Sequence, residues 1–246
     1  MYRTRPGRTA LAALAVLAVL TVVPLAGATT AATTTVTVRI EGTGSTLLPP
    51  TAVALRAGTV NLDGVAGDSC SSLTAAGALL VATHANWKGT WSKSLHGYFI
   101  TAVDGLALPA TGAEYWAFWV NDAPASQGIC GYRPRPGDSL LFFPDCYGKK
   151  CPPNHGVLGV KAPATVTAGH PATITVTAYS DTAGKPSPQA GATLSGGGAS
   201  AKTAAGGTAQ ITFATPGRYL LHVSAPHTLR TEARICVRSA TTNPCG

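Results

Sequence analysis

One aromatic segment, residues 114–122 (EYWAFWVND), holds the side chains that could form a binding site. Successive side chains of a strand point to opposite faces, so Tyr115 and Trp119 would share one face, with Asn121 and Asp122 at the end of the strand. An exposed aromatic pair beside polar side chains is typical of a platform for a small molecule or a sugar. The alternative is that this face packs under a neighbouring loop.

The opposite face of the same strand is purely apolar. It consists of Trp116, Phe118 and Val120. Large aromatic side chains at strand spacing most often belong to a core. We therefore expect this face to pack against a helix.

The sequence contains no recognisable catalytic constellation. The six histidines are scattered, no nucleotide fingerprint is present, and residues 42–45 (GTGS) lack the context of a nucleophile elbow. Among only ten acids, Glu114 with Asp104 or Asp122 is the best pair for glycoside hydrolysis. We therefore expect no enzyme activity and assign no catalytic residue, with a secreted hydrolase of unknown type as an alternative.

Metal and redox chemistry also find little support. Histidines would have to come from distant segments to form a zinc site, and no CxxC motif is present. We therefore expect neither a bound metal nor a cofactor.

The N-terminal segment has the pattern of a secretory signal. Three arginines precede a nearly unbroken apolar run over residues 11–25, and small residues follow up to Ala28. This predicts a signal peptide, residues 1–28, that is cleaved after export to the extracellular space or cell surface. An uncleaved anchor helix is the alternative. No later apolar run exists, so we expect no stable membrane insertion after cleavage.

The positive charge is modest once this segment is removed. The formal net charge falls from +8 to +5, because three arginines and no acids lie in residues 1–28. This balance does not indicate nucleic-acid binding. Four basic residues could meet an anionic cell-envelope polymer, although a solvated basic rim is the simpler alternative; they are Arg133, Arg135, Lys149 and Lys150.

The six cysteines agree with export. An even number of cysteines in an exported chain predicts disulfides, but six allow fifteen pairings and the sequence does not choose among them. Closeness along the chain favours two short bridges and leaves one long one. The favoured pairs are Cys146–Cys151, Cys236–Cys245 and Cys70–Cys130.

The first half of the chain combines strand patterns with one helical pattern. Alternation predicts a strand at 35–40, and apolar residues recur at helical spacing from Leu73 to Val81 after a possible cap at Ser71 or Ser72. Pro49-Pro50 predicts a turn region at 46–50. Further strands are expected at 52–55, 59–62, 98–103 and 139–143.

Several motifs carry a family resemblance. YWAFWVND, then G-x-C, PGDSLLFF and DCYGKKC, resemble a domain of unknown function of bacterial exported proteins that is related to the C-terminal domain of transcobalamin and intrinsic factor. Asn121, Gly137 and Asp138 match its pattern. Asp122 stands where that family usually has Gly, so the turn must accept Asp at positive φ or change type.

The resemblance implies a fold and a second candidate function. It implies an α+β domain over residues 29–151, a β-grasp-like sheet with one helix. In transcobalamin-like proteins this domain covers one face of a corrinoid held mainly by a helical barrel, which this chain lacks. A small-ligand, corrinoid-like binding protein using Tyr115, Trp119 and Asn121 is therefore an alternative function.

The rest of the chain has a different pattern. Residues 152–157 form a Pro-rich linker, and residues 158–246 contain about seven short alternating segments with regular turn signals. This predicts an all-β, Ig-like sandwich that resembles bacterial Ig-like repeats of cell-surface adhesins. The whole chain is thus expected to be an exported, non-catalytic binding or cell-surface interaction protein for an unknown small molecule or cell-envelope polymer.

Overall fold

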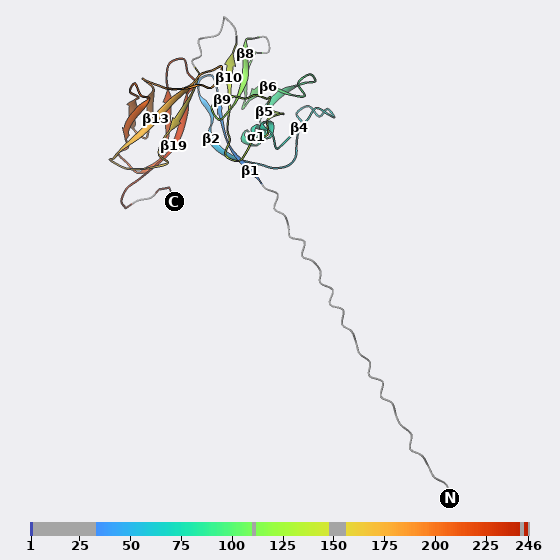
Figure 1. The fold of residues 1–246 in the computed structure, drawn as a ribbon, viewed down its shortest axis with the longest axis horizontal. Helices are drawn as coiled ribbons and strands as arrows, with labels where there is room; N and C mark the ends of the chain where they lie inside the picture. The colour runs from blue at the N-terminus through green and yellow to red at the C-terminus, as the bar shows by residue number, and fades with distance from the viewer. Residues whose placement is uncertain (2–32, 110–111, 148–155, 242–243, 246) are drawn as a thin grey trace. The chain divides into compact units, whose positions relative to one another are not determined.

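The computed structural model describes residues 1, 33–109, 112–147, 156–241 and 244–245 (Figure 1). Residues 33–246 belong to one compact unit. The predicted signal peptide, most of the predicted linker, Lys149, Lys150 and Cys151 lie outside the described residues, so their predictions stay predictions.

The α+β prediction for the first half is wrong. Strands make up 51% of the described residues and helix 4%, and the single helix among them, α1, spans only Ala75–Ala82. The segments after it form strands. The fold is therefore mostly β, with several sheets, and it is not a β-grasp.

The largest sheet of the first half has the strand order β2-β1-β10-β8-β9. β1 pairs in parallel with β10, and the other pairs are antiparallel. Alternation in β1 buries Val36, Val38 and Ile40, as expected from the sequence. The five strands are β1 (Thr34–Glu41), β2 (Thr46–Leu55), β8 (Glu114–Val120), β9 (Ala123–Pro124) and β10 (Ser139–Cys146).

The turn expected at 46–50 is part of strand β2. Pro49 and Pro50 lie in a register shift between the pairs Val38–Thr51 and Ile40–Leu48. Proline cannot donate to a ladder, but β2 is an edge strand, where a bulge tolerates it. The double proline therefore bends the strand without ending it.

Two smaller sheets complete the first half. One has the order β5-β6-β7, and the other pairs β3 with β4. β6 exposes one face and buries the other, since Tyr98 packs against Trp87 and Trp91 at ring distances of 6.0 and 4.9 Å. The strands are β3 (Thr59–Val60), β4 (Cys70–Ser71), β5 (Trp87–Ser92), β6 (Gly97–Val103) and β7 (Leu106–Ala107).

Helix α1 is held by backbone groups from a distant loop. The Ala75 and Ala76 amides donate to the carbonyls of Tyr132 and Ile129, at 2.9 and 3.0 Å. These bonds satisfy donors that a helix N-terminus leaves unpaired. A Cβ at Gly77 would lie 2.0 Å from the Ser72 carbonyl oxygen, so close packing explains the glycine that interrupts the apolar run.

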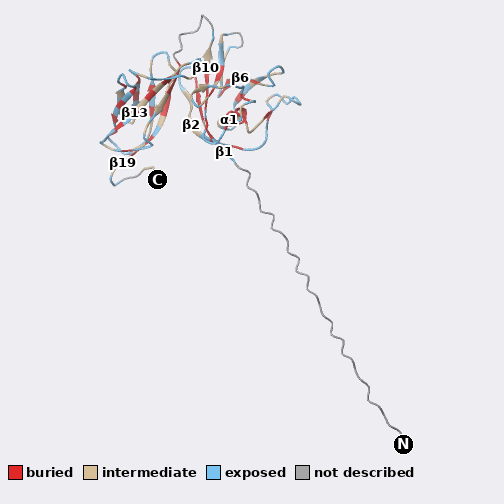
Figure 2. Ribbon diagram, viewed as in Figure 1, coloured by how far each residue is buried: buried red, intermediate tan, exposed pale blue. Residues whose placement is uncertain are grey.

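The second half consists of two further sheets around a shared apolar cluster. Their buried residues alternate along the strands (Figure 2). The relation to Ig-like repeats stays a prediction. One sheet contains β11 (Val157–Lys161), β13 (Pro171–Tyr179), β14 (Pro186–Pro188) and β17 (Thr208–Thr212); the other contains β12 (Thr165–Thr167), β15 (Thr193–Gly196), β16 (Ala199–Lys202), β18 (Gly217–Ser224) and β19 (Thr231–Arg238).

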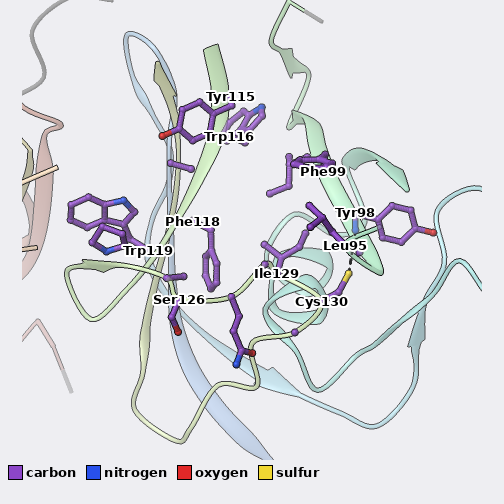
Figure 3. Close-up of a pocket in the computed structure, with 18 of the residues that line it drawn as sticks. Leu95, Tyr98, Phe99, Tyr115, Trp116, Phe118, Trp119, Ser126, Ile129 and Cys130 are labelled. Atoms are coloured by element: carbon purple, nitrogen blue, oxygen red, sulfur yellow. Dashed lines mark hydrogen bonds between the residues drawn. The ribbon is translucent and has the colours of Figure 1, made fainter. Parts of the chain in front are cut away.

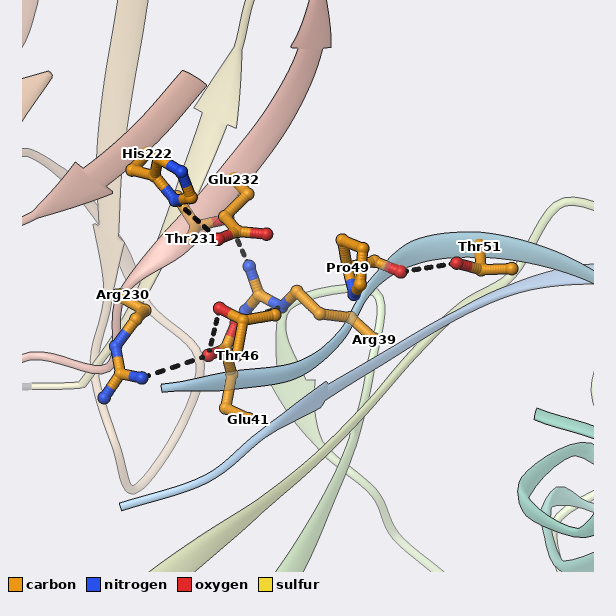
Figure 4. Close-up of polar contacts among 9 residues, drawn as sticks. All are labelled: Arg39, Glu41, Thr46, Pro49, Thr51, His222, Arg230, Thr231 and Glu232. Carbon is orange, nitrogen blue, oxygen red and sulfur yellow. Dashed lines mark hydrogen bonds and ion pairs between the residues drawn. The ribbon is translucent and has the colours of Figure 1, made fainter. Parts of the chain in front are cut away.

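A buried charged cluster joins β1 to β19 (Figure 4). Arg39 donates to the Thr231 hydroxyl, and Glu41 lies 3.7 Å from both Arg39 and Arg230. Burial lowers the pKa of Arg39 and raises the pKa of Glu41, and their mutual attraction opposes both shifts. Separating β1 from β19 would leave buried charges without their partners, which is strongly destabilising. The cluster therefore favours this arrangement of the two strands.

Two of the favoured disulfides are present. Cys70–Cys130 closes a loop with a sequence separation of 60, and Cys236–Cys245 one of 9. The partner favoured for Cys146 lies outside the described residues. Disulfides persist in oxidising environments, so the two bridges are consistent with an extracellular protein. In the part of the chain that the structure describes, no helix is long and apolar enough to cross a membrane.

The long disulfide is expected to stabilise the protein more than the short one. Replacing Cys70 and Cys130 by Ser should lower the free energy of unfolding by about 4 kcal/mol. Replacing Cys236 and Cys245 by Ser should lower it by about 2.5 kcal/mol, because the entropy of loop closure grows with loop length. Urea denaturation followed by tryptophan fluorescence measures both. Equal losses for the two double variants would contradict this expectation.

Candidate binding site

A cavity of about 830 Å³ lies between β6, β8 and the loop 124–131 (Figure 3). This volume is in the usual range of small-molecule sites. Its lining is mainly apolar and comes from segments far apart in the sequence. The principal lining side chains are Leu95, Phe99, Tyr115, Trp116, Phe118 and Ile129.

The rim of the cavity exposes three large apolar side chains. Leu95, Phe99 and Tyr115 are 66%, 58% and 43% exposed. Phe99 points outward because its neighbour Tyr98 occupies the buried face of β6. Large apolar side chains that gather at one cavity mark a place where another molecule can cover them.

The wall formed by β8 is firmly packed. Phe118 stacks on Phe142 at a ring distance of 5.0 Å and contacts Tyr132 edge-on at 5.8 Å. Trp116 is 7% exposed, and its Nε1 has no acceptor among the described residues. The wall therefore combines fixed aromatic surfaces with one buried hydrogen-bond donor, Trp116 Nε1, that has no acceptor among the described residues.

The loop 124–131 is fastened at both ends. The Ala125 amide donates to the Phe118 carbonyl at 3.1 Å, and Ile129 accepts from the helix α1 amide described above. Cys130 is bonded to Cys70, and the Tyr98 amide donates to the Cys130 sulfur at 3.4 Å. The cavity is thus preformed, which limits the ordering that binding must impose.

The polar end of the cavity contains two carboxylates. The Tyr115 hydroxyl donates to Asp145 Oδ2 at 3.2 Å, across the β8–β10 pair. Partial burial and the negative charge of Asp145 raise the pKa of Tyr115 to about 12, so the phenol stays protonated. Asp181, from the turn after β13, completes this end.

The structure separates the predicted platform residues. Tyr115 lies at the cavity rim, whereas Trp119 is only 3% exposed. Trp119 contributes to the lining but packs against Phe143 at a ring distance of 5.9 Å, in a cluster with Val157. Its face is thus covered, as in the packing alternative, but by strand β11 at the start of the second half and not by a neighbouring loop.

Asn121 and Asp122 do not line this cavity. They form the two-residue turn between β8 and β9, with φ of 50° and 65°. Of the two possibilities raised by the sequence, the turn accepts Asp122 at positive φ in the place where the resembling family usually has Gly. Asn121 donates to Asp138 at 2.9 Å and accepts from the Ser139 amide at 2.9 Å, so it fixes the turn to β10.

Asp138 anchors a second, polar pocket of about 440 Å³ that Arg133 and Arg135 also line. Burial disfavours ionisation of Asp138, but hydrogen bonds from the Arg135 amide, Asn121 and Tyr132 outweigh burial, and the pKa lies below its ordinary value. The carboxylate is thus saturated with donors from its own chain.

Sequence reasoning missed Leu95, Phe99 and Asp181. Alternation within residues 98–103 places Phe99 opposite Tyr98, and this signal could have identified it. No sequence signal places Asp181 here, because it comes from the other half of the chain. Among the described residues, no cluster of three or more His, Cys, Asp or Glu side chains could hold a metal ion.

Comparison with known families adds one partial match. Residues 77–143 match the domain of unknown function DUF4430. The match includes β6, β8, the loop 124–131 and most of β10. No curated protein matches the chain.

Three solved structures show weak likenesses. A "putative metal binding protein" from Ruminococcus gnavus ATCC 29149 is 13% identical, with a TM-score of 0.32, over 47% of this chain and 99% of its own. The Arg-specific cysteine proteinase gingipain R is 14% identical, with a TM-score of 0.27, over 45% of this chain and 23% of its own. A β-glycosidase from Bacteroides vulgatus is 12% identical, with a TM-score of 0.28, over 51% of this chain and 21% of its own.

Replacing Asp138 by Asn should lower the free energy of unfolding at pH 7 by about 2 kcal/mol, because an amide cannot accept from all of its donors. The folded pKa is depressed, so this stabilisation is complete above the ordinary value of 3.8 and is lost as pH falls through the folded pKa. Urea denaturation between pH 7 and pH 2 measures the difference. The exposed Asp104→Asn is the control, and a difference that does not shrink as pH falls below 3.8 would contradict the assignment.

Proposed function

We propose that the protein is an exported, non-catalytic binding protein whose cavity beside β8 holds a small, largely apolar ligand. The observation that carries this proposal is the convergence of exposed Leu95, Phe99 and Tyr115 on one preformed cavity. A polymer would need a long open groove, whereas this cavity has the volume of a small-molecule site.

Export to the extracellular space or cell surface rests on the predicted signal peptide and is supported by the two disulfides. The absence of a catalytic role is supported by the placement of Glu114, the best candidate acid, which does not line the cavity. Asp104 and Asp122 do not line it either.

A neutral fluorescent dye tests the proposal. N-phenyl-1-naphthylamine should bind the purified protein with increased fluorescence, and Phe99→Ala should raise its Kd about tenfold, because the dye loses an apolar contact. Phe99 is 58% exposed, so this change should leave the fold intact.

The matched control is Val65→Ala, since Val65 is also exposed (51%) but lies outside the cavity lining. Its Kd should equal that of the wild type. Absence of dye binding, or an equal effect of both substitutions, would overturn the proposal.

A further inference from the structure

The edge of β8 that faces the cavity has no partner strand along most of its length. β10 pairs with the opposite edge over the whole strand, from Glu114 to Val120. β9 pairs with the cavity-side edge only at Trp119 and Val120. Among the described residues, no strand pairs with this edge from Glu114 to Phe118. An open strand edge presents unpaired backbone groups to whatever lies beside it.

Two hydrogen bonds determine which backbone groups point to this edge. Immediately beyond one end of β8, the Asn121 amide donates to the Ser139 carbonyl at 2.9 Å. Immediately beyond the other end, the Tyr147 amide donates to the Ala113 carbonyl at 3.0 Å. In an antiparallel pair, positions bonded to the partner alternate with positions whose amide and carbonyl point away from it. Counting from either bond, the odd-numbered residues of β8 point to β10 and the even-numbered residues point to the open edge.

The backbone groups on the open edge are those of Glu114, Trp116 and Phe118. The Phe118 carbonyl accepts from the Ala125 amide at 3.1 Å, which agrees with this direction. Among the described residues, no hydrogen bond involves the Phe118 amide, the Trp116 amide and carbonyl, or the Glu114 carbonyl. Donors and acceptors therefore alternate along the edge, and equivalent groups lie about 6.8 Å apart.

Strand β6 lies on the other side of the cavity. Phe99 of β6 and Trp116 of β8 lie on opposite sides of it (Figure 3). Consecutive residues of both strands, 97–100 and 115–119, line the cavity, so it opens between two strand edges and not over one face of a sheet. β5 pairs with one edge of β6, and β7 pairs only with Ala102 and Val103 on the other. A strand placed here would continue the ladder that β9 begins.

Apolar side chains flank the open edge on both faces of β8. Trp116 and Phe118 pack into the cluster that contains α1. On the opposite face, Ala117 and Trp119 belong to the cluster with Val157. An extended segment directs alternate side chains to opposite faces. Apolar residues at successive positions of such a segment would therefore meet apolar surface on both sides.

From this arrangement we propose that the ligand is a short apolar peptide, which binds in extended conformation as an added strand between β8 and β6. Its amides donate to the carbonyls of Glu114 and Trp116, and its carbonyls accept from the amides of Trp116 and Phe118. A segment of four residues is about 13 Å long, so it fits a site of small-molecule size.

Complementarity between backbone groups is the reason for choosing a peptide. An extended peptide repeats its donors and acceptors at the spacing of the open edge, so opposite partial charges meet along the whole edge. An apolar molecule with a single polar group would leave most of these backbone groups unpaired. This inference rests on the proposed function, because it assigns the chemical class of the molecule that the same cavity holds.

A defined mixture of peptides tests the inference without assuming a sequence. It contains acetylated, amidated tetrapeptides in which every position is Ala, Thr, Val or Phe. After ultrafiltration with the full chain, mass spectrometry should identify retained tetrapeptides, and the tightest should displace N-phenyl-1-naphthylamine. Phe99→Ala should raise its Kd about tenfold through loss of an apolar contact, whereas the exposed Val65→Ala should leave the Kd unchanged.

An ester analogue of the retained tetrapeptide tests recognition of the backbone. The analogue keeps every side chain but replaces the backbone amides by esters, which lack a hydrogen-bond donor. Its Kd should be at least about tenfold higher, because the carbonyls of Glu114 and Trp116 lose their donors.

NMR of the isotope-labelled chain locates the bound peptide. Nuclear Overhauser contacts should join backbone protons of the peptide to the amide protons of Trp116 and Phe118. The amides of Tyr115 and Ala117 are the matched controls within the same strand, because they point to β10 and should show no such contact.

The outcomes separate the two proposals. If the dye binds through Phe99 but no tetrapeptide is retained, the cavity is a binding site and the peptide inference is wrong. The inference is also wrong if the ester analogue binds as tightly as the peptide, or if the peptide contacts the amides of Tyr115 and Ala117. Contacts from a second copy of the chain to the amides of Trp116 and Phe118 would likewise overturn it. If neither dye nor tetrapeptide binds, both proposals are overturned.

Discussion

The pairing of β8 with β10, buried on both faces, is the constraint on which the rest of the structure depends. Trp119 lies opposite Leu141, and Phe118 lies opposite Phe142. One face of this pair packs into the cluster that contains α1, and the other packs against Val157 at the start of the second half. A strand pair with apolar side chains on both faces must be covered on both sides. The start of the second half therefore covers one face of this sheet.

This two-sided burial also determines where a binding site can form. Both faces of the middle of β8 are occupied, and the cavity reaches the strand near Tyr115 and beside the loop 124–131. That region is held open by a packed wall and a fastened loop, with Cys130 bridged to Cys70. Preorganised walls lower the ordering cost of binding. The packing that stabilises the core therefore also shapes the cavity.

Sequence reasoning recovered the local features and failed where several elements had to be combined. Strand parity placed Trp116 and Trp119 on opposite faces of β8, and the resemblance offered positive φ at Asp122 as one of two possibilities, because both features depend on neighbouring residues. The helical pattern from Leu73 to Val81 corresponds to α1, but the α+β fold class was wrong, since local patterns could not reveal how the many strands pair into separate sheets. The exposure of Trp119 could not be predicted either, because the residues that cover it, such as Val157, come from a segment that the sequence places in another domain.

The turn that carries Asp181 changes the role expected for the second half. A spacer domain needs only a stable contact with its neighbour. The apolar cluster around Trp119 and the buried pair Arg39–Glu41 would provide such a contact. A turn that places a carboxylate in the cavity of the first half, and whose Gly184 leaves no room for a side chain against β9, is unnecessary for a spacer. Both halves therefore line this cavity, and its charge depends on the contact between them.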